Sequence, residues 1–357
     1  MKFSLLTLGL AAVFLTSCGN DSEKKKDPVK DPVSSSDKKW KELKTSANTF
    51  FAVLPEESVN PDNPTSAEKV ALGQALYFDN RLSKDQTQSC NTCHDLNNFG
   101  VDSEPVSDGD DGKSKGTRNS PTTLNAAFHF AQFWDGRAKD VEEQAGMPVT
   151  NPVEMNIPSE DFLVKRLKKV DFYKEMFAAA YPDDKDPITY DNIKKAIGVF
   201  ERELITPSKF DKYLAGDDKA LNDAEKEGLK TFIDQGCIAC HSGPVLGGAM
   251  MQKFPVFGKY EDYLSGTVDM GKYEETKNDM DKFMFKVPSL RNIEKTGPYM
   301  HDGSMSDLSE VVKMMGKAEL GKDISDEQAK SIVTFMNTLT GDVDAKYKTA
   351  PAVLSES

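Results

Sequence analysis

Cysteine, histidine and positive charge are all in short supply in this sequence. Its 357 residues include five cysteines and four histidines, and 58 acidic residues outweigh 45 basic ones to give a formal net charge of −13. Because few groups in such a chain would neutralise phosphates, we expect no nucleic-acid binding, and a basic partner would be attracted instead. After the first residues no segment is apolar enough to cross a membrane, and alternating patterns typical of strands are missing.

Enough apolar residues are present to build buried cores. The apolar fraction is 38% and the aromatic fraction 9%, which excludes wholesale disorder. The length predicts two domains.

The first residues are typical of an export signal. Lys2 precedes an apolar run from Phe3 to Leu15 that is too short to span a bilayer. The run leads into LTSCG, which resembles a bacterial lipobox with a lipid on Cys18; an ordinary signal peptide that contains a cysteine is the alternative. We therefore predict a lipoprotein signal peptide over residues 1–17 and a disordered tether over residues 18–39, in which two Asp-Pro pairs disfavour helix. The protein would be periplasmic and lipid-anchored to a membrane.

The other four cysteines form two copies of one motif. The strings are Cys90-Asn91-Thr92-Cys93-His94 and Cys237-Ile238-Ala239-Cys240-His241. This CxxCH spacing attaches c-type haem: the two thiols add to the haem vinyl groups, and the adjacent histidine reaches the iron. A thioredoxin-like pair needs no following histidine, and a zinc site would leave both histidines without a role. We predict two covalent haem c groups, and no cysteine remains for a disulfide.

Helical periodicity dominates the rest of the chain. Ile193, Ile197, Phe200 and Leu204 are spaced as one face of a helix. Capping patterns predict helix starts at Thr65 with Glu68, at Ser159, at Asn222 with Glu225, at Ser306, and at Ser325 with Gln328.

These patterns predict an all-α fold of two cytochrome c-like domains, each carrying one haem. The polar stretch around Pro207 marks the boundary. The expected parts are an N-terminal haem domain over residues 40–206, a C-terminal haem domain over 207–342, and a tail over 343–357 that packs back on the first domain.

A second axial ligand is harder to assign from the residues alone. Methionine is the usual strong partner of histidine and raises the haem potential. Of the 14 methionines, those downstream of His241 are best placed, and Met314 and Met315 follow the His301-Asp302-Gly303 stretch. Core filling is the alternative for any single methionine.

Longer strings make the pattern specific. They are Leu72-Gly73, Arg81-Leu82-Ser83, Ser89 to His94, Arg118-Asn119-Ser120-Pro121-Thr122, Gln132-Phe133-Trp134-Asp135-Gly136-Arg137, Pro152-Val153-Glu154-Met155, Lys286-Val287-Pro288-Ser289-Leu290-Arg291-Asn292 and Gly297-Pro298-Tyr299-Met300-His301-Asp302-Gly303. In this order they resemble the bacterial di-haem cytochrome c peroxidase family, over about residues 69–341.

The resemblance implies a role for each haem. The first, on His94, would be the peroxidatic centre, and the second, with His241 and Met315 as axial ligands, the high-potential electron store. It also implies a distal acid–base residue at Glu154, with Phe133, Gln144, Pro148 and Met155 around it, and Trp134 between the haems.

Further implications concern a metal and partners. A calcium ion would be held by the side chain of Asn119 and backbone oxygens of Thr296 and Pro298. The substrate would be hydrogen peroxide, the electron donor a small cytochrome c or cupredoxin, and the assembly a homodimer.

Elementary chemistry agrees with these roles. Cleaving the O–O bond of peroxide to water takes two electrons and a proton moved to the leaving oxygen. Two one-electron centres match this demand, a carboxylate such as Glu154 can carry the proton, and an aromatic ring such as Trp134 can offer an electron path. A surface carboxylate and a core aromatic are the alternative readings of these two residues.

The sequence departs from the family in one loop. Most members carry a histidine there that occupies the peroxidatic iron in the oxidised state. Here residues 107–113 contain no histidine, and Asp111 stands about where it would be. We therefore expect a peroxidatic haem that is open even when ferric. His129 could substitute as a ligand, but an ordinary core or surface histidine is favoured, and His301 is expected to be structural or haem-adjacent.

Two other functions compete with the peroxidase. A maturation enzyme that oxidises protein side chains would carry Tyr in place of the methionine ligand, so Met315 argues against it. A non-enzymatic di-haem carrier would keep both irons six-coordinate, and Glu154 argues against that.

Overall fold

The computed structural model describes residues 35–355. The predicted signal peptide, the lipid site at Cys18 and most of the predicted tether lie outside the described residues. Helix α1 begins at Ser35, so the prediction of a tether up to residue 39 is wrong at its end. The last Asp-Pro pair is complete at Pro32, and nothing after it prevents a helix that buries Leu43 and Ala47.

The fold is rich in helix and has little sheet, as expected. The longer helices are α1 (Ser35–Phe50), α2 (Ala67–Phe78), α4 (Val141–Thr150), α5 (Glu160–Leu167), α6 (Asp171–Ala180), α7 (Tyr190–Arg202), α9 (Asp223–Gln235), α11 (Leu308–Leu320) and α12 (Asp326–Met336). Shorter ones are α3 (Cys90–Cys93), α8 (Lys209–Leu214) and α10 (Tyr273–Thr276), and 3₁₀ turns are frequent between them. Strands β1 (Met251–Lys253) and β2 (Met284–Lys286) pair antiparallel, with Met251 opposite Lys286. In this part of the chain no helix is both long and apolar enough to span a membrane.

Most of the predicted helix starts are where the capping patterns put them. Ser159, Asn222 and Ser325 each cap the helix that follows. Two predictions are wrong by one residue: Ser66 rather than Thr65 caps α2, and Asp307 rather than Ser306 caps α11. In each pair both residues are favourable N-cap residues, and the sequence alone does not show at which of them the helix begins.

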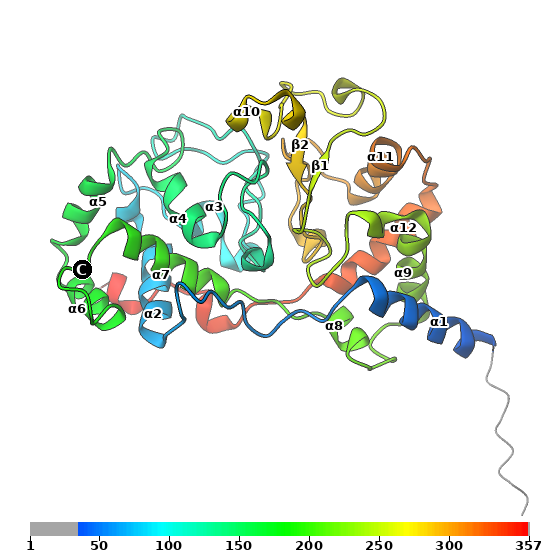
Figure 1. The fold of residues 1–357 in the computed structure, drawn as a ribbon, viewed down its shortest axis with the longest axis horizontal. Helices are drawn as coiled ribbons and strands as arrows, with labels where there is room; N and C mark the ends of the chain where they lie inside the picture. Colours follow the sequence, from blue (N-terminus) through cyan, green and yellow to red (C-terminus); the bar gives the residue numbers. More distant parts are fainter. Residues whose placement is uncertain (1–34, 356–357) are drawn as a thin grey trace, which may run out of the picture.

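The first buried cluster lies in one half of the molecule. Helices α2, α4, α5, α6 and α7 enclose Tyr77, Phe177 and Phe200, all fully buried. Val343 and Tyr347, from the C-terminal segment, belong to the same cluster, and the Tyr347 hydroxyl donates a hydrogen bond of 2.7 Å to Glu203. The end of the described chain therefore lies in this half, beside α6 (Figure 1).

The second cluster lies in the other half and includes the start of the described chain. Phe51, Phe210, Phe232 and Phe335 pack ring against ring between α8, α9 and α12. Helix α1 packs here too, beside α8 and α9 (Figure 1). This differs from the expected domain start at residue 40, because an amphipathic stripe shows that a helix is packed but not which half covers it.

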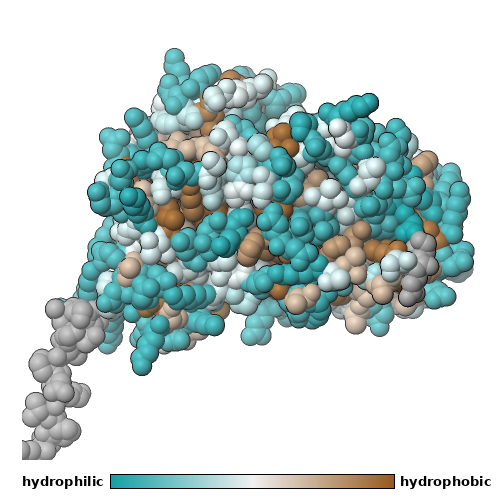
Figure 2. Space-filling view, turned by 180° about the vertical axis from the view of Figure 1, so that it is seen from behind, coloured by the Kyte–Doolittle hydropathy of each residue, from teal (hydrophilic) through white to brown (hydrophobic). Residues whose placement is uncertain are grey.

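A third, smaller cluster lies beside the short sheet. Phe254, Tyr260, Phe285 and Met300 form it, and Trp134 packs against it from the first half. The surface in Figure 2 is mostly hydrophilic, with apolar residues in small separate groups, as the high charge content suggests.

A buried ion pair ties several segments of the second half together. The Arg291 guanidinium is fully buried and donates to the Asp211 carboxylate on α8, with one bond of 2.8 Å. Asp211 also accepts from the backbone of Leu54 at 2.8 Å, and Arg291 donates to the carbonyl of Pro244 at 2.6 Å. The pair therefore joins four stretches of chain that are far apart in sequence.

We expect Asp211→Ala to lower the free energy of unfolding by about 3–5 kcal/mol, because it leaves Arg291 buried without its counter-charge. Denaturant unfolding of the holoenzyme measures this. Replacing both partners together, Asp211→Leu with Arg291→Met, should cost less than the single change. A single-variant loss below about 1 kcal/mol, the size for an exposed pair, would contradict this account.

Candidate functional site

The first CxxCH motif opens into a large cavity of about 950 Å³. Its lining brings together nearly every residue predicted for the peroxidatic site: Cys90, Cys93, His94, Phe133, Trp134, Gln144, Pro148, Glu154 and Met155. These side chains come from α3, from the loop before α4, from α4 itself and from the turn after it.

Local hydrogen bonds hold the first motif in shape. Helix α3 is a single turn closed by Ser89 and Thr92, and His94 ends it. The carbonyl of His94 accepts a bond of 2.7 Å from the Tyr77 hydroxyl. His94 is half-buried, its Nδ1 is buried without a hydrogen-bond partner, and removal from water lowers the pKa of the imidazole. A neutral imidazole beside two thiols is the donor set that a c-type haem requires, so the residues fit the group.

Glu154 occupies a well-fixed turn beside this cavity. Its backbone N–H donates to Asn151 at 3.1 Å, and its carbonyl accepts from Asp110 at 2.7 Å. Burial raises the pKa of its carboxyl, although the nearby Arg137 guanidinium and a hydrogen bond from Asn151 act in the opposite direction. A raised pKa makes the carboxylate a stronger base and so better suited to accept a proton and return it.

The loop of residues 107–113 is closed by its own hydrogen bonds. Gly109 N–H donates to Ser114 at 2.7 Å, and Gly116 N–H to Ser107 at 2.9 Å. The exposed Asp111 carboxylate accepts from the backbone of Lys113 and Ser114 at 2.9 and 2.7 Å, which lowers its pKa. Asp111 is not among the residues that line the cavity.

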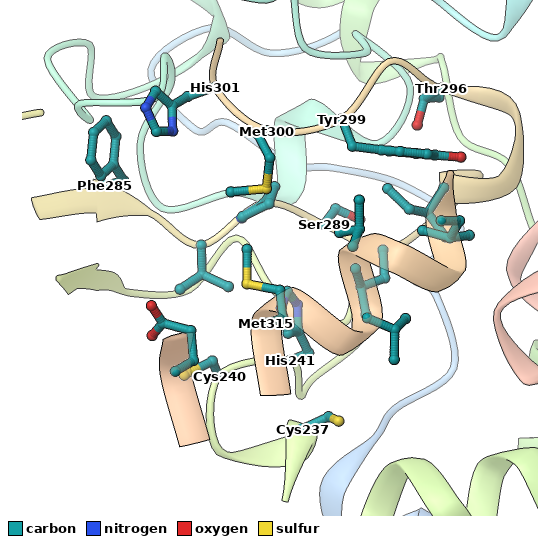
Figure 3. Close-up of a pocket in the computed structure, with 18 of the residues that line it drawn as sticks. Cys237, Cys240, His241, Phe285, Ser289, Thr296, Tyr299, Met300, His301 and Met315 are labelled. Atoms are coloured by element: carbon teal, nitrogen blue, oxygen red, sulfur yellow. The ribbon is translucent and has the colours of Figure 1, made fainter. Parts of the chain in front are cut away.

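The second CxxCH motif lines a smaller cavity of about 230 Å³. Cys237, Cys240 and His241 meet Met315 of α11 there, whereas Met314 is not part of the lining (Figure 3). His241 Nδ1 lies 3.0 Å from the carbonyl of Leu246, which orients the ring, and burial lowers the pKa of this imidazole. The free nitrogen Nε2 is then the one available to a metal, so this set also fits a haem.

Trp134 lines both cavities and forms part of the wall between them. Its indole N–H donates to the carbonyl of Asn119 at 2.9 Å, and its ring lies edge-on to that of His301, with centroids 6.1 Å apart. His301 is buried and its Nε2 lies 2.7 Å from the Tyr260 hydroxyl.

The three residues expected at a calcium ion lie around the second cavity. Asn119, Thr296 and Pro298 all line it. The Asn119 amide donates through Nδ2 to the carbonyl of Glu104 at 2.9 Å, which leaves its oxygen as the acceptor calcium would need. Over the described residues no group of three or more His, Cys, Asp or Glu side chains could hold a metal.

Sequence reasoning missed the charged groups of the cavity walls. Arg118 and Arg137 both pair with Asp135, and Arg118 also pairs with Asp269. Glu201 lines the first cavity, and burial raises the pKa of this carboxyl to about 8. The FWDGR string contains part of this network, but a partner as distant in sequence as Asp269 leaves no local signal.

Glu154 should make stability depend on pH. Because folding raises its pKa, the folded protein keeps this proton at pH values where the unfolded chain has lost it, so its carboxyl weakens the fold progressively as the pH rises through that interval. We expect Glu154→Gln to gain stability relative to the wild type as the pH rises. Denaturant unfolding at several pH values measures this, with the exposed Glu175→Gln as control. A difference that is independent of pH would show that the pKa is not raised.

Comparison with known proteins places the chain in a family. The family model described as di-haem cytochrome c peroxidase matches residues 67–219. Cytochrome c551 peroxidase of Pseudomonas aeruginosa is 41% identical over 301 residues, which cover 84% of this chain and 86% of that protein. Methylamine utilization protein MauG of Methylophilus methylotrophus is 33% identical and covers 83% of this chain and 92% of that protein.

A solved structure gives the same answer for the fold. A MauG-like protein associated with microbial copper homeostasis superposes with a TM-score of 0.75 at 28% identity, covering 84% of this chain and 97% of the other. The CxxCH cavities, the ordered strings and the similarity along most of the chain agree: the protein belongs to the di-haem cytochrome c peroxidase family.

Proposed function

We propose that this protein is a cytochrome c peroxidase, which reduces hydrogen peroxide to water with electrons from a small cytochrome c or cupredoxin. One observation carries the proposal: a cavity with a haem-binding motif and the half-buried Glu154 carboxyl shares a wall with a second haem-binding cavity that contains a methionine. The higher identity to a relative named as a peroxidase than to one named MauG supports it.

Each cavity would hold one haem c. Cys90 and Cys93 would bind the first haem covalently and Cys237 and Cys240 the second, with His94 and His241 as proximal ligands. Met315 would be the second axial ligand in the smaller cavity. When bound, the two haems would together supply the two electrons that peroxide reduction takes, and methionine as a ligand would raise the potential of the second.

Glu154 would handle the proton. Its carboxyl lines the first cavity together with the Gln144 amide and is held by the turn that Asn151 begins. It would take a proton from the near oxygen of peroxide and return it to the far oxygen, which leaves as water. Gln144 would orient the substrate by hydrogen bonding, and Phe133 and Met155 would limit the room for water.

Trp134 would conduct between the two centres. It lines both cavities, and the hydrogen bond to Asn119 fixes its ring. Between the two cavities an electron would have to pass through saturated side chains and backbone. An aromatic ring fixed in the wall shortens that part of the path.

The same proposal includes the location of the protein, its assembly, its domains and a calcium ion. The chain would be exported, anchored through a lipid on Cys18 in the periplasm, and active as a homodimer. One haem would belong to each of two domains divided near Pro207, and Asn119, Thr296 and Pro298 would hold one calcium ion between them.

Removing the acid should slow peroxide reduction specifically. We expect Glu154→Gln to lower kcat/KM for hydrogen peroxide by about 10²–10⁴-fold, since the proton transfer is lost while both haem sites remain. Oxidation of a reduced small cytochrome c by peroxide measures the rate. Glu175→Gln, which removes an exposed carboxylate, should match the wild type. Equal rates for both variants would remove Glu154 from the mechanism.

The histidine-free loop should make the oxidised enzyme active as isolated. We expect immediate turnover by the ferric wild type, because the loop has no histidine to occupy the peroxidatic iron. Asp111→Asn, which removes the charge without adding a ligand, should stay immediately active. The same assay with ferric and pre-reduced aliquots tests this.

The outcomes separate the two parts of the proposal. A wild type active only after pre-reduction would remain a peroxidase but not one with an open ferric site. No turnover in either form with several donors would favour a side-chain-oxidising enzyme or an electron carrier.

A further inference from the structure

The wall between the two cavities contains a buried lysine. Lys286 is the last residue of β2, is only 5% exposed, and lines both cavities. Its backbone N–H donates to the carbonyl of Trp134 at 2.7 Å, so its place in the wall is fixed by the sheet and by the tryptophan loop together.

This lysine has no ion-pair partner among the described residues. Asp135 acts on Lys286 electrostatically, but its carboxylate already pairs with Arg118 at 2.5 Å and Arg137 at 2.8 Å. Asp269, the other carboxylate of the network, pairs with Arg118 at 2.6 Å. Among the described residues no carboxylate forms an ion pair with Lys286, because Asp135 and Asp269 are engaged by the two arginines. An ammonium buried without an ion-pair partner is costly, so an anion that reached Lys286 would stabilise it.

His129 adds a hydrogen-bond donor without an acceptor. Lys286 Nζ lies 3.1 Å from His129 Nδ1, and because an ammonium can only donate, Nδ1 must accept and the ring proton lies on Nε2. His129 Nε2 is buried and has no hydrogen-bond partner. The ring packs closely on Gly248, where a Cβ would come within 2.4 Å of it, so it has little freedom to turn. This tautomer leaves no lone pair on Nε2, which argues against the iron-ligand role that the sequence left open.

Both residues line both cavities, which makes such an anion identifiable by its chemistry. It must reach a side chain that is only 5% exposed, and it must carry charge and accept from an ammonium. A haem brings such groups with it, since its propionates are carboxylates fixed to the ring edge.

We propose that Lys286 and His129 form a carboxylate-binding subsite for a propionate of one of the two haems. This proposal rests on the proposed function in one respect only: it requires that the protein binds haem. Its ammonium would raise the reduction potential of the haem it holds, because gaining an electron makes that haem more negative and a nearby cation favours this state.

Redox titration of the holoenzyme, with the two haems resolved spectroscopically, tests the subsite. We expect Lys286→Met to weaken electron uptake by the contacted haem about tenfold, or about 59 mV for one electron. Lys286→Arg, which keeps the charge, should stay near the wild type. Lys226→Met is the matched control, since Lys226 is also buried but lines neither cavity. The haem whose potential falls is the one whose propionate is bound.

The results distinguish this subsite from the proposed function. If the wild type contains no covalent haem, the proposed function fails first. If haem is present and Lys286→Met moves neither potential more than Lys226→Met does, the subsite is overturned. Should Lys286→Met not assemble, His129→Leu and His129→Gln replace it: only the leucine variant should lower a potential, because glutamine keeps an N–H donor, and equal potentials would overturn the proposal.

Discussion

The structure depends on how the Asp135 carboxylate is held. It pairs with Arg118 and Arg137, and Gln132 and Ala138 close the loop between them with a backbone hydrogen bond of 2.7 Å. Phe133 adopts a left-handed backbone conformation within this loop, with φ of 64°. These constraints present Phe133 to one cavity and Trp134 to both, so one anchored turn sets the wall on which both centres rely.

Three cationic side chains line the cavities of a chain that is acidic overall. The net charge of −13 is spread over an exposed surface, where water screens it. Arg118, Arg137 and Lys286 are much less exposed, and charges there act more strongly because the surroundings are less polarisable. The net charge therefore bears on the association of this protein with other proteins, whereas the charged side chains at the cavities bear on the electrostatic environment inside them.

Sequence reasoning succeeded where a signal is local. The CxxCH strings and the caps at Asn222 and Ser325 are complete within a few residues, and the ordered strings identified the family. Glu154 was reached only through the resemblance, because an isolated glutamate resembles any surface carboxylate. The place of α1, the pairing of Arg118 with Asp269 and the buried Lys286 depend on contacts between distant segments, and a single sequence does not encode those contacts in any readable pattern.

The start of the described chain lies in the second half of the molecule, and its end lies in the first half. Helix α1 packs with the second half, and Val343 and Tyr347 pack with the first. The hydrophobic core of each half thus includes a segment from the opposite end of the chain. Neither half could be excised alone without exposing apolar surface that a segment from the other half covers, so we expect the loss of one half to destabilise the half that remains.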